Sequence, residues 1–137
     1  MWRRVETRRV PVVVHAGHDV TGRTTAAELA PLDRVARRFP GLPLVVAHAA
    51  HPATAAAVAL VQEHPNVYVD LTPRVVDVVA LGAGTVEAIA DRVLFGSDLP
   101  NTQVTLEANL ATLAPLPPAT RTQVASGNAA RLLGEVR

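Results

Sequence analysis

Cysteine and lysine are both absent from the 137 residues, so all 13 basic side chains are arginine. Without cysteine the chain has no disulfide framework, no thiolate metal site and no thiol nucleophile. Without lysine it has no Schiff-base chemistry, no P-loop lysine and no metal bridge through a modified lysine. Aromatic residues are also scarce, at 3%, while hydrophobic residues make up 49% and charged residues 18%. This balance excludes an intrinsically disordered chain.

Long apolar runs are missing as well. Apolar runs such as residues 12–14 and 42–47 are far shorter than the roughly 20 residues that span a bilayer. The basic start of the chain, residues 1–4, is not followed by an apolar segment, so we expect no signal peptide and a cytoplasmic location. A net charge of +1 gives no indication of a nucleic-acid or membrane partner. The length predicts that residues 1–137 form a single domain.

One unit recurs four times along the chain: a short apolar run, then a polar residue, then a stretch with helical character. The apolar runs are residues 10–14, 42–47, 66–69 and 92–95. Short, continuous, β-branched runs are typical of strands buried on both faces of a parallel sheet. Their spacing fits βαβ units of about 30 residues with right-handed crossovers. We therefore predict an α/β fold, either an open doubly wound sheet or part of a (β/α) barrel.

The intervals between the runs predict helices. Pro31 suits a first helical position, and Pro40 and Gly41 end that helix. Thr72 and Thr85 are predicted N-caps of two later helices. The expected helices cover residues 31–39, 52–64, 73–81, 85–90 and 103–114, with a last short one at 128–134.

Polar residues gather where the four predicted strands end. His15, His48 and Asp70 each follow a strand directly, and Asp98 follows the fourth within Gly96-Ser97-Asp98. The carboxyl ends of parallel strands open onto one face, where reactive groups of α/β folds collect. Two histidines and an aspartate are ligands that zinc or manganese takes. The sequence therefore predicts a metal-binding or catalytic site at this edge.

Each of these residues also has a plainer interpretation. The two strand-end histidines could be satisfied rim residues, and Asp98 an Asx-turn residue, while Asp70 is interpreted as a cap of its own turn. His18 and His51 each lie three residues beyond a strand-end histidine, which leaves a second ligand role open. His64 closes a predicted helix, where a cation near the negative end of the helix dipole is the ordinary explanation.

Five short motifs follow one another in a fixed order, and together they resemble a known family. The series is similar to the C-terminal half of the amidohydrolase-related metal-dependent hydrolases, the group that includes aminocarboxymuconate-semialdehyde decarboxylase-like enzymes. The resemblance covers the chain from about Val10 to Gly134. The motifs are VVHAG at 13–17, FPGLPLVVAH at 39–48, PNVYVD at 65–70, RVLFGSDLP at 92–100 and NAARLLG at 128–134.

The resemblance implies a (β/α)8 barrel with a divalent metal at its carboxyl-terminal mouth, the four strands here matching strands five to eight. His15 matches the strand-five metal ligand. His48 matches the strand-six histidine, a ligand in some members and a catalytic residue in others. Asp98 matches the strand-eight aspartate, which binds or adjoins the metal and handles a proton. The expected cofactor is zinc, with manganese as the alternative, and Asn128 is interpreted as a helix cap.

The resemblance also implies that part of the family's barrel and of its metal site is not contained in this chain. The family's strand-one His-x-His pair does not occur here, and a complete barrel takes about 250 residues. We therefore expect a domain truncated at its N-terminal side that associates with itself or with a missing N-terminal half. The predicted fold is a parallel sheet in the order 1-2-3-4, curved like half a barrel, with helices on its outer face.

The expected reaction is hydrolysis or non-oxidative decarboxylation of a small carboxylated or lactone-like substrate, catalysed by His48 and Asp98. One alternative is a catalytically inactive half-barrel that serves as a structural or interaction module. Another is an unrelated open-sheet domain that binds phosphate, which the lack of closely spaced glycines in a strand-end loop disfavours.

Overall fold

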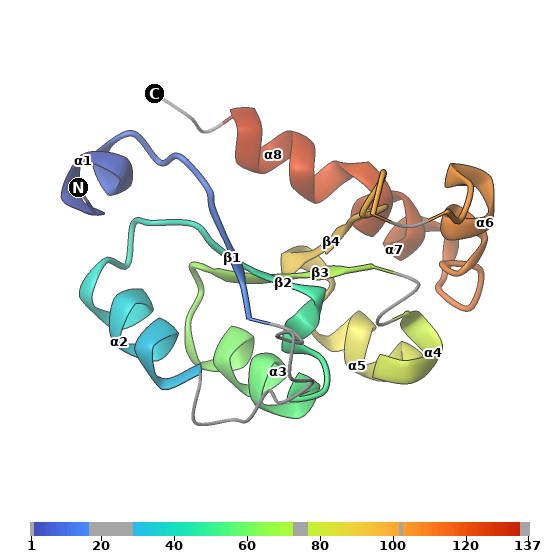
Figure 1. Ribbon diagram of the computed structural model, residues 1–137, viewed down its shortest axis with the longest axis horizontal. Helices are drawn as coiled ribbons and strands as arrows, with labels where there is room; N and C mark the ends of the chain where they lie inside the picture. Colours follow the sequence, from blue (N-terminus) through green and yellow to red (C-terminus); the bar gives the residue numbers. More distant parts are fainter. Residues whose placement is uncertain (1, 17–28, 73–76, 102, 135–137) are drawn as a thin grey trace.

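A computed structural model describes residues 2–16, 29–72, 77–101 and 103–134. Four strands alternate with helices along the chain (Figure 1). The elements are α1 (Trp2–Thr7), β1 (Val12–His15), α2 (Ala30–Arg38), β2 (Leu44–Ala47), the 3₁₀ turn η2 (His48–Ala50), α3 (Thr54–Glu63), β3 (Val67–Leu71), α4 (Val78–Leu81), α5 (Ala83–Ala88), the 3₁₀ turn η3 (Ala90–Arg92), β4 (Val93–Phe95), α6 (Leu106–Ala111), α7 (Pro118–Thr122), the π-helical turn η4 (Gln123–Gly127) and α8 (Asn128–Gly134).

The four strands form one parallel sheet in the order β1-β2-β3-β4. Each strand pairs with the next along the chain, so the sheet has none of the interleaving of an open doubly wound fold. Val14, Val46, Val69 and Val93 lie side by side in register across it. The prediction of consecutive parallel (β/α) units is confirmed.

The main core lies on one face of the sheet. Alternate strand residues point to the same side, so the row of registered valines packs there together with Leu44, Val67 and Leu71. Helices α2, α3, α4 and α5 lie along this side in Figure 1. Ala36, Val61 and Val86 contribute to the same cluster. Burial of these apolar side chains is the main force that holds the helices on the sheet.

The second face of the sheet carries a much smaller cluster. Val45 and Tyr68 are buried there with Leu132 of α8, and the guanidinium of Arg131 lies 6.0 Å from the centre of the Tyr68 ring. Val13, in register with Val45, is 64% exposed. The predicted placement of the helices on the outer face does not hold for α8, which lies on the opposite side of the sheet (Figure 1), where its Leu132 packs against Val45 and Tyr68.

The helix starts differ from the predicted caps at two positions. Asp77 is the N-cap of α4, its carboxylate accepting from the Ala80 N–H at 2.8 Å, so Thr72 is not the cap. Helix α5 begins directly after Gly82, whose φ of +88° suits glycine, so Thr85 lies inside the helix and does not cap it. The predicted helix over 103–114 is shorter, running from Leu106 to Ala111 after the N-cap Thr105.

The chain also contains an unpredicted first helix, α1. The Trp2 ring lies 6.4 Å from the Phe39 ring, and Glu6 accepts a hydrogen bond from the Gly41 N–H at 3.0 Å. These contacts attach α1 to the loop before β2. Within the part of the chain that the structure describes, no helix is long and apolar enough to cross a membrane.

Asn128 is not a helix cap, although its place at the predicted helix start suggested one. The helical path continues from α7 through η4 into α8, so Asn128 has helical φ and ψ of −67° and −41° and helical residues already precede it. Its buried amide instead donates to the carbonyls of Ala90 and Val93, both at 2.7 Å. Asn128 therefore attaches the last helix to the start of β4.

Candidate functional site at the carboxyl ends of the strands

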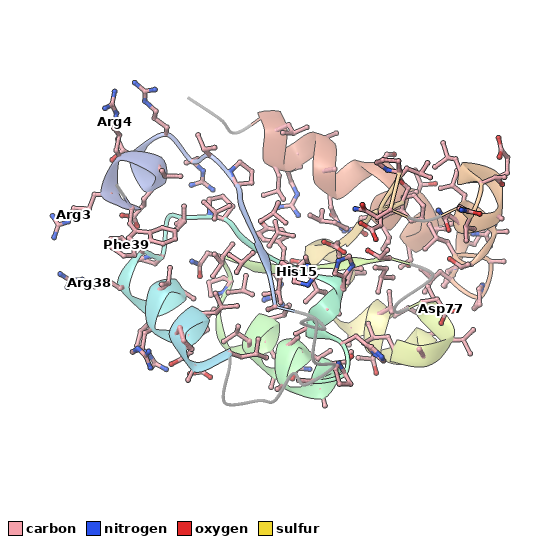
Figure 2. The ribbon with its side chains drawn as sticks, viewed as in Figure 1. Arg3, Arg4, His15, Arg38, Phe39 and Asp77 are labelled. Carbon is pink, nitrogen blue, oxygen red and sulfur yellow. The ribbon has the colours of Figure 1, made fainter. Side chains whose placement is uncertain are left out.

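His15 and His48 meet at the carboxyl ends of β1 and β2. His15 pairs in register with Ala47, the residue before His48. The two imidazole rings lie edge to face, with their centres 5.1 Å apart. Figure 2 shows His15 at the end of β1, next to the ends of the neighbouring strands. The parallel register thus brings together two histidines that are 33 positions apart in the sequence.

The backbone that follows β2 makes an unusual turn. His48, Ala49 and Ala50 have φ values of +55°, +44° and +52°. Left-handed conformations cost a non-glycine residue roughly 1–2 kcal/mol each, so a run of three needs support from its surroundings. Ala49 and Ala50 are completely buried in the main core, which holds the turn in place. Strained backbone of this kind is typical of functional sites.

Asp70 connects the end of β3 to this turn. Its Oδ1 accepts a hydrogen bond from the backbone N–H of His48 at 2.9 Å and another from the hydroxyl of Thr72 at 3.0 Å. The contact with Thr72 is local, as the turn interpretation of Asp70 predicts. The contact with His48 crosses to the neighbouring strand, which the sequence did not indicate. Asp70 is therefore both a turn residue and a support for His48.

Thr72 belongs to this arrangement and was missed as a site residue. Its Oγ1 lies 2.8 Å from Nδ1 of His48, and its side chain is almost completely buried. Gly96 of the β4 end lies against it: a Cβ atom there would stand 3.5 Å from Thr72 Oγ1 and 3.7 Å from Asp70 Oδ1. The position of Thr72, two residues after a strand-end aspartate, is the sequence signal that indicates it.

Asp98 follows β4 in a tight turn of its own. It has a φ of +54°, and its Oδ1 accepts a hydrogen bond from the Asn101 amide at 3.1 Å. This contact fits the Asx-turn interpretation, while the positive φ is the second strained backbone position at a strand end. The meeting of Asp98 with the two histidines stays a prediction.

Two further histidines, His18 and His51, lie three residues beyond the strand-end histidines. His18 lies outside the described residues. His51 is half-buried and closes the left-handed turn, its backbone N–H donating to the His48 carbonyl at 2.9 Å.

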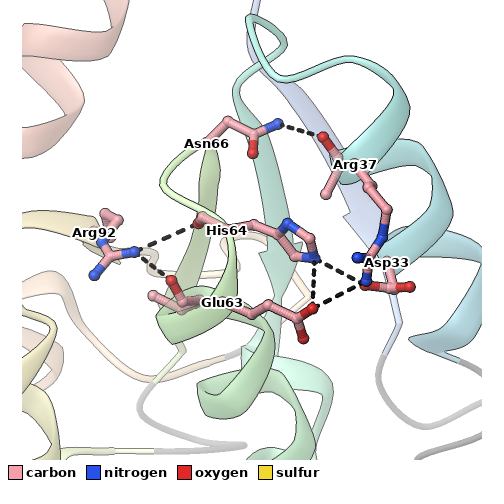
Figure 3. Close-up of polar contacts among 8 residues, drawn as sticks. Asp33, Arg37, Glu63, His64, Asn66 and Arg92 are labelled. Atoms are coloured by element: carbon pink, nitrogen blue, oxygen red, sulfur yellow. Dashed lines mark hydrogen bonds and ion pairs between the residues drawn. The ribbon is translucent and has the colours of Figure 1, made fainter.

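A second group of potential metal ligands lies between α2 and α3 (Figure 3). Donor atoms of Asp33, Glu63 and His64 all lie within 4.8 Å of one another. The buried His64 follows the end of α3, as predicted, and donates from Nε2 to Asp33 at 2.8 Å, a specific partner that the sequence did not indicate. This hydrogen bond, followed by the hydrogen bond and charge of Arg37, lowers the pKa of Asp33.

Arg37 binds both carboxylates of this second group, and we call Asp33, Arg37, Glu63 and His64 together the outer group or outer ion-pair network. Its Nη2 lies 3.0 Å from Asp33 Oδ1 and 2.9 Å from Glu63 Oε1, so one guanidinium binds both carboxylates. The group is therefore an ion-pair network that joins two helices.

Comparison with known proteins bears on the strand-end site. The sequence profile of the amidohydrolase family matches residues 1–134. The chain belongs to the amidohydrolase family. A search of curated proteins gave no significant match.

Solved structures of related folds match this chain over nearly its whole length. An uncharacterized TIM-barrel protein from Bordetella bronchiseptica is 26% identical, with a TM-score of 0.78 over 98% of this chain and 49% of its own. A zinc-bound amidohydrolase from Burkholderia multivorans is 20% identical, with a TM-score of 0.68 over 97% and 56%. A manganese-bound dihydroxybenzoic acid decarboxylase from a Polaromonas species is 17% identical, with a TM-score of 0.67 over 97% and 52%. The chain therefore spans about half the length of these TIM-barrel proteins.

Proposed function

We propose that this amidohydrolase supplies the strand-five-to-eight half of a metal-dependent active site that hydrolyses or decarboxylates a small carboxylated or lactone-like substrate. The observation that carries the proposal is the ring contact of His15 with His48 at the ends of adjacent strands. The zinc-bound amidohydrolase and the manganese-bound decarboxylase with related folds support this choice of chemistry and cofactor.

The types of donor side chain suit a divalent ion. Two imidazoles from adjacent strands, with a carboxylate at the end of a third, are the ligand types of zinc and manganese sites. His15, His48 and Asp98 would hold the ion. When bound, a divalent ion supplies Lewis-acid polarisation of a carbonyl and makes water more acidic.

The side chains of this chain have separate tasks in such a reaction. His48, held by its turn and by Asp70, orients water or stabilises negative charge developing on a substrate oxygen. Asp98 accepts the proton of the attacking water and returns it to the leaving group. A decarboxylation uses the same carboxyl group to deliver a proton to the carbon that loses carbon dioxide.

Metal content and turnover of point variants test the proposal. In protein purified with zinc, His15→Ala lowers the bound zinc measured by elemental analysis. His64→Gln, a control in the outer ion-pair network, leaves the zinc content unchanged. If His64→Gln instead lowers the zinc content and His15→Ala leaves it unchanged, the metal binds at the outer group and the proposal is contradicted.

Turnover is measured with an N-terminal half-barrel supplied, on a panel of small aromatic carboxylates and lactones. Asp98→Asn abolishes turnover, because an amide cannot accept the water proton. Unchanged turnover in this variant would exclude Asp98 as the proton acceptor. Protein that binds no metal and converts no substrate even with the other half would favour the interaction module without activity.

A further inference from the structure

The Thr72 hydroxyl lies between two polar partners at the strand-end site. Its Oγ1 is 2.8 Å from Nδ1 of His48 and 3.0 Å from Oδ1 of Asp70. Thr72 is only 2% exposed, so these two groups, and not bulk water, satisfy its hydroxyl. The hydroxyl thus forms a bridge between the Asp70 carboxylate and the His48 ring.

Counting hydrogens fixes the direction of this bridge. A carboxylate only accepts, so the single hydroxyl hydrogen of Thr72 is donated to Asp70. The Thr72 oxygen can then only accept from the His48 ring. Nδ1 of His48 must therefore carry a hydrogen, and in the neutral ring this leaves Nε2 with its lone pair.

We propose that Thr72 is a positioning residue that fixes His48 in the Nδ1–H tautomer, so that Nε2 is the nitrogen available to a metal ion or to a proton. The role rests on the proposed function of the site, because the exposed lone pair matters only where an ion or substrate meets it. Ligating histidines commonly have their other ring nitrogen held in this way by a hydrogen-bond partner.

The surroundings keep the bridge in one geometry. The Asp70 oxygen that receives the Thr72 hydrogen also accepts the backbone N–H of His48 at 2.9 Å, so ring and backbone of His48 are held by one carboxylate. Gly96 has no side chain where it passes the bridge, and the Thr72 oxygen lies 3.5 Å from the place of a Cβ atom. Asp70 therefore acts on the His48 ring through Thr72.

The tautomer can be measured directly by NMR on protein with isotopically labelled histidine rings, kept free of metal by a chelator, at a pH where the rings are neutral. The signals of His48 are identified by their loss in His48→Gln. We expect the Nδ1–H form in the wild type and in Thr72→Ser, which keeps the hydroxyl. In Thr72→Val, which keeps the shape and removes the hydroxyl, we expect the Nε2–H form that free histidine prefers.

Zinc titration of the same proteins gives the second readout. Loss of the outer partner of a ligating histidine weakens metal binding by about 10–100-fold, so Thr72→Val should bind zinc that much more weakly while Thr72→Ser binds like the wild type. An Nε2–H ring in the wild type, or an unchanged ring in folded Thr72→Val, would overturn the inference. If Thr72→Val does not fold, the wild-type tautomer alone decides.

The two proposals fail in distinguishable ways. An Nδ1–H ring in a wild-type protein that binds no zinc supports the role of Thr72 in fixing the tautomer and contradicts the proposed metal site. An Nε2–H ring in a protein that binds zinc through His15 and His48 contradicts the role of Thr72 and supports the proposed metal site.

Discussion

At the scale of single residues, two buried asparagines hold strand starts in place. The Asn66 amide donates to the carbonyls of Phe39 and Leu42, at 3.0 and 2.9 Å, just before β3. The Asn128 amide does the same for Ala90 and Val93 at the start of β4. Both side chains supply hydrogen-bond donors to backbone carbonyls in largely buried surroundings, where the loss of a donor is costly.

Removing the Asn128 amide should therefore destabilise the whole domain. Asn128→Ala leaves the carbonyls of Ala90 and Val93 without this donor, and we expect the free energy of unfolding to fall by about 1–3 kcal/mol. Urea denaturation followed by circular dichroism measures the change. Ser126→Ala, an exposed position two residues earlier, should stay within about 0.5 kcal/mol of the wild type. Equal stability of the two variants would show that the buried amide contributes nothing.

At the scale of elements, α2 and α3 are joined by the ion-pair network of Asp33, Arg37, Glu63 and His64 (Figure 3). The network begins where α3 ends, because Glu63 is the last residue of that helix. Arg92, just before β4, donates to the carbonyls of Val61 and His64 in the same region. Polar contacts thus fix the relative position of two helices that the apolar core alone holds less specifically.

The lowered pKa of Asp33 gives this network a pH dependence. Because that pKa is lower in the folded than in the unfolded chain, ionised Asp33 favours folding above the ordinary aspartate value of about 3.9, and this contribution is lost as the pH falls through the folded-state pKa. Asp33→Asn should therefore be less stable than the wild type at neutral pH, and the difference should narrow in acid. The midpoints of urea denaturation of the two proteins, determined at several pH values, measure this difference in stability and its change with pH.

The matched control for this pH series is Glu87→Gln, which removes an exposed carboxylate from α5, outside the network. The difference in stability between Glu87→Gln and the wild type should stay nearly constant across the same pH range. A constant difference for Asp33→Asn as well would mean that the hydrogen bond from His64 does not couple Asp33 to folding.

At the scale of the whole molecule, the sheet has two outer strands and one sparsely covered face. Among the residues that the structure describes, β1 and β4 each pair with one strand only, and Val13 on the second face is 64% exposed. Edges and apolar faces of this kind recruit further strands. The chain spans about half of its TIM-barrel relatives, so we propose that a second half-barrel, from another copy or from a missing N-terminal half, covers this face.

The chain on its own should accordingly associate with itself. We expect the average mass in sedimentation equilibrium to rise with concentration, because the second face and both sheet edges are available. Val13→Glu places a charge on that face and should shift the protein towards monomer. Val79→Glu is the control, since Val79 is 74% exposed on α4, and it should associate like the wild type. A wild-type chain that stays monomeric at all concentrations would contradict the proposed interface.

The sequence by itself determined the parallel sheet and its strand-end residues. Short β-branched runs at regular intervals indicate parallel βαβ units, so the common edge of His15, His48 and Asp70 followed from local pattern and chirality. Sequence resemblance added the family and the half-barrel, because five weak motifs in a fixed order are more specific together than alone.

Only the tertiary structure decided which groups meet, because contacts between distant residues depend on register and on backbone turns that no local pattern encodes. The left-handed turn brings the ring of His48 to Thr72, and helix packing brings His64 to Asp33. Asn128 looked like a cap because its neighbours favour a helix start, yet the preceding helix continues through it. Leu132 packs on the second face because the path of α8 across the sheet is fixed by packing and not by its own sequence.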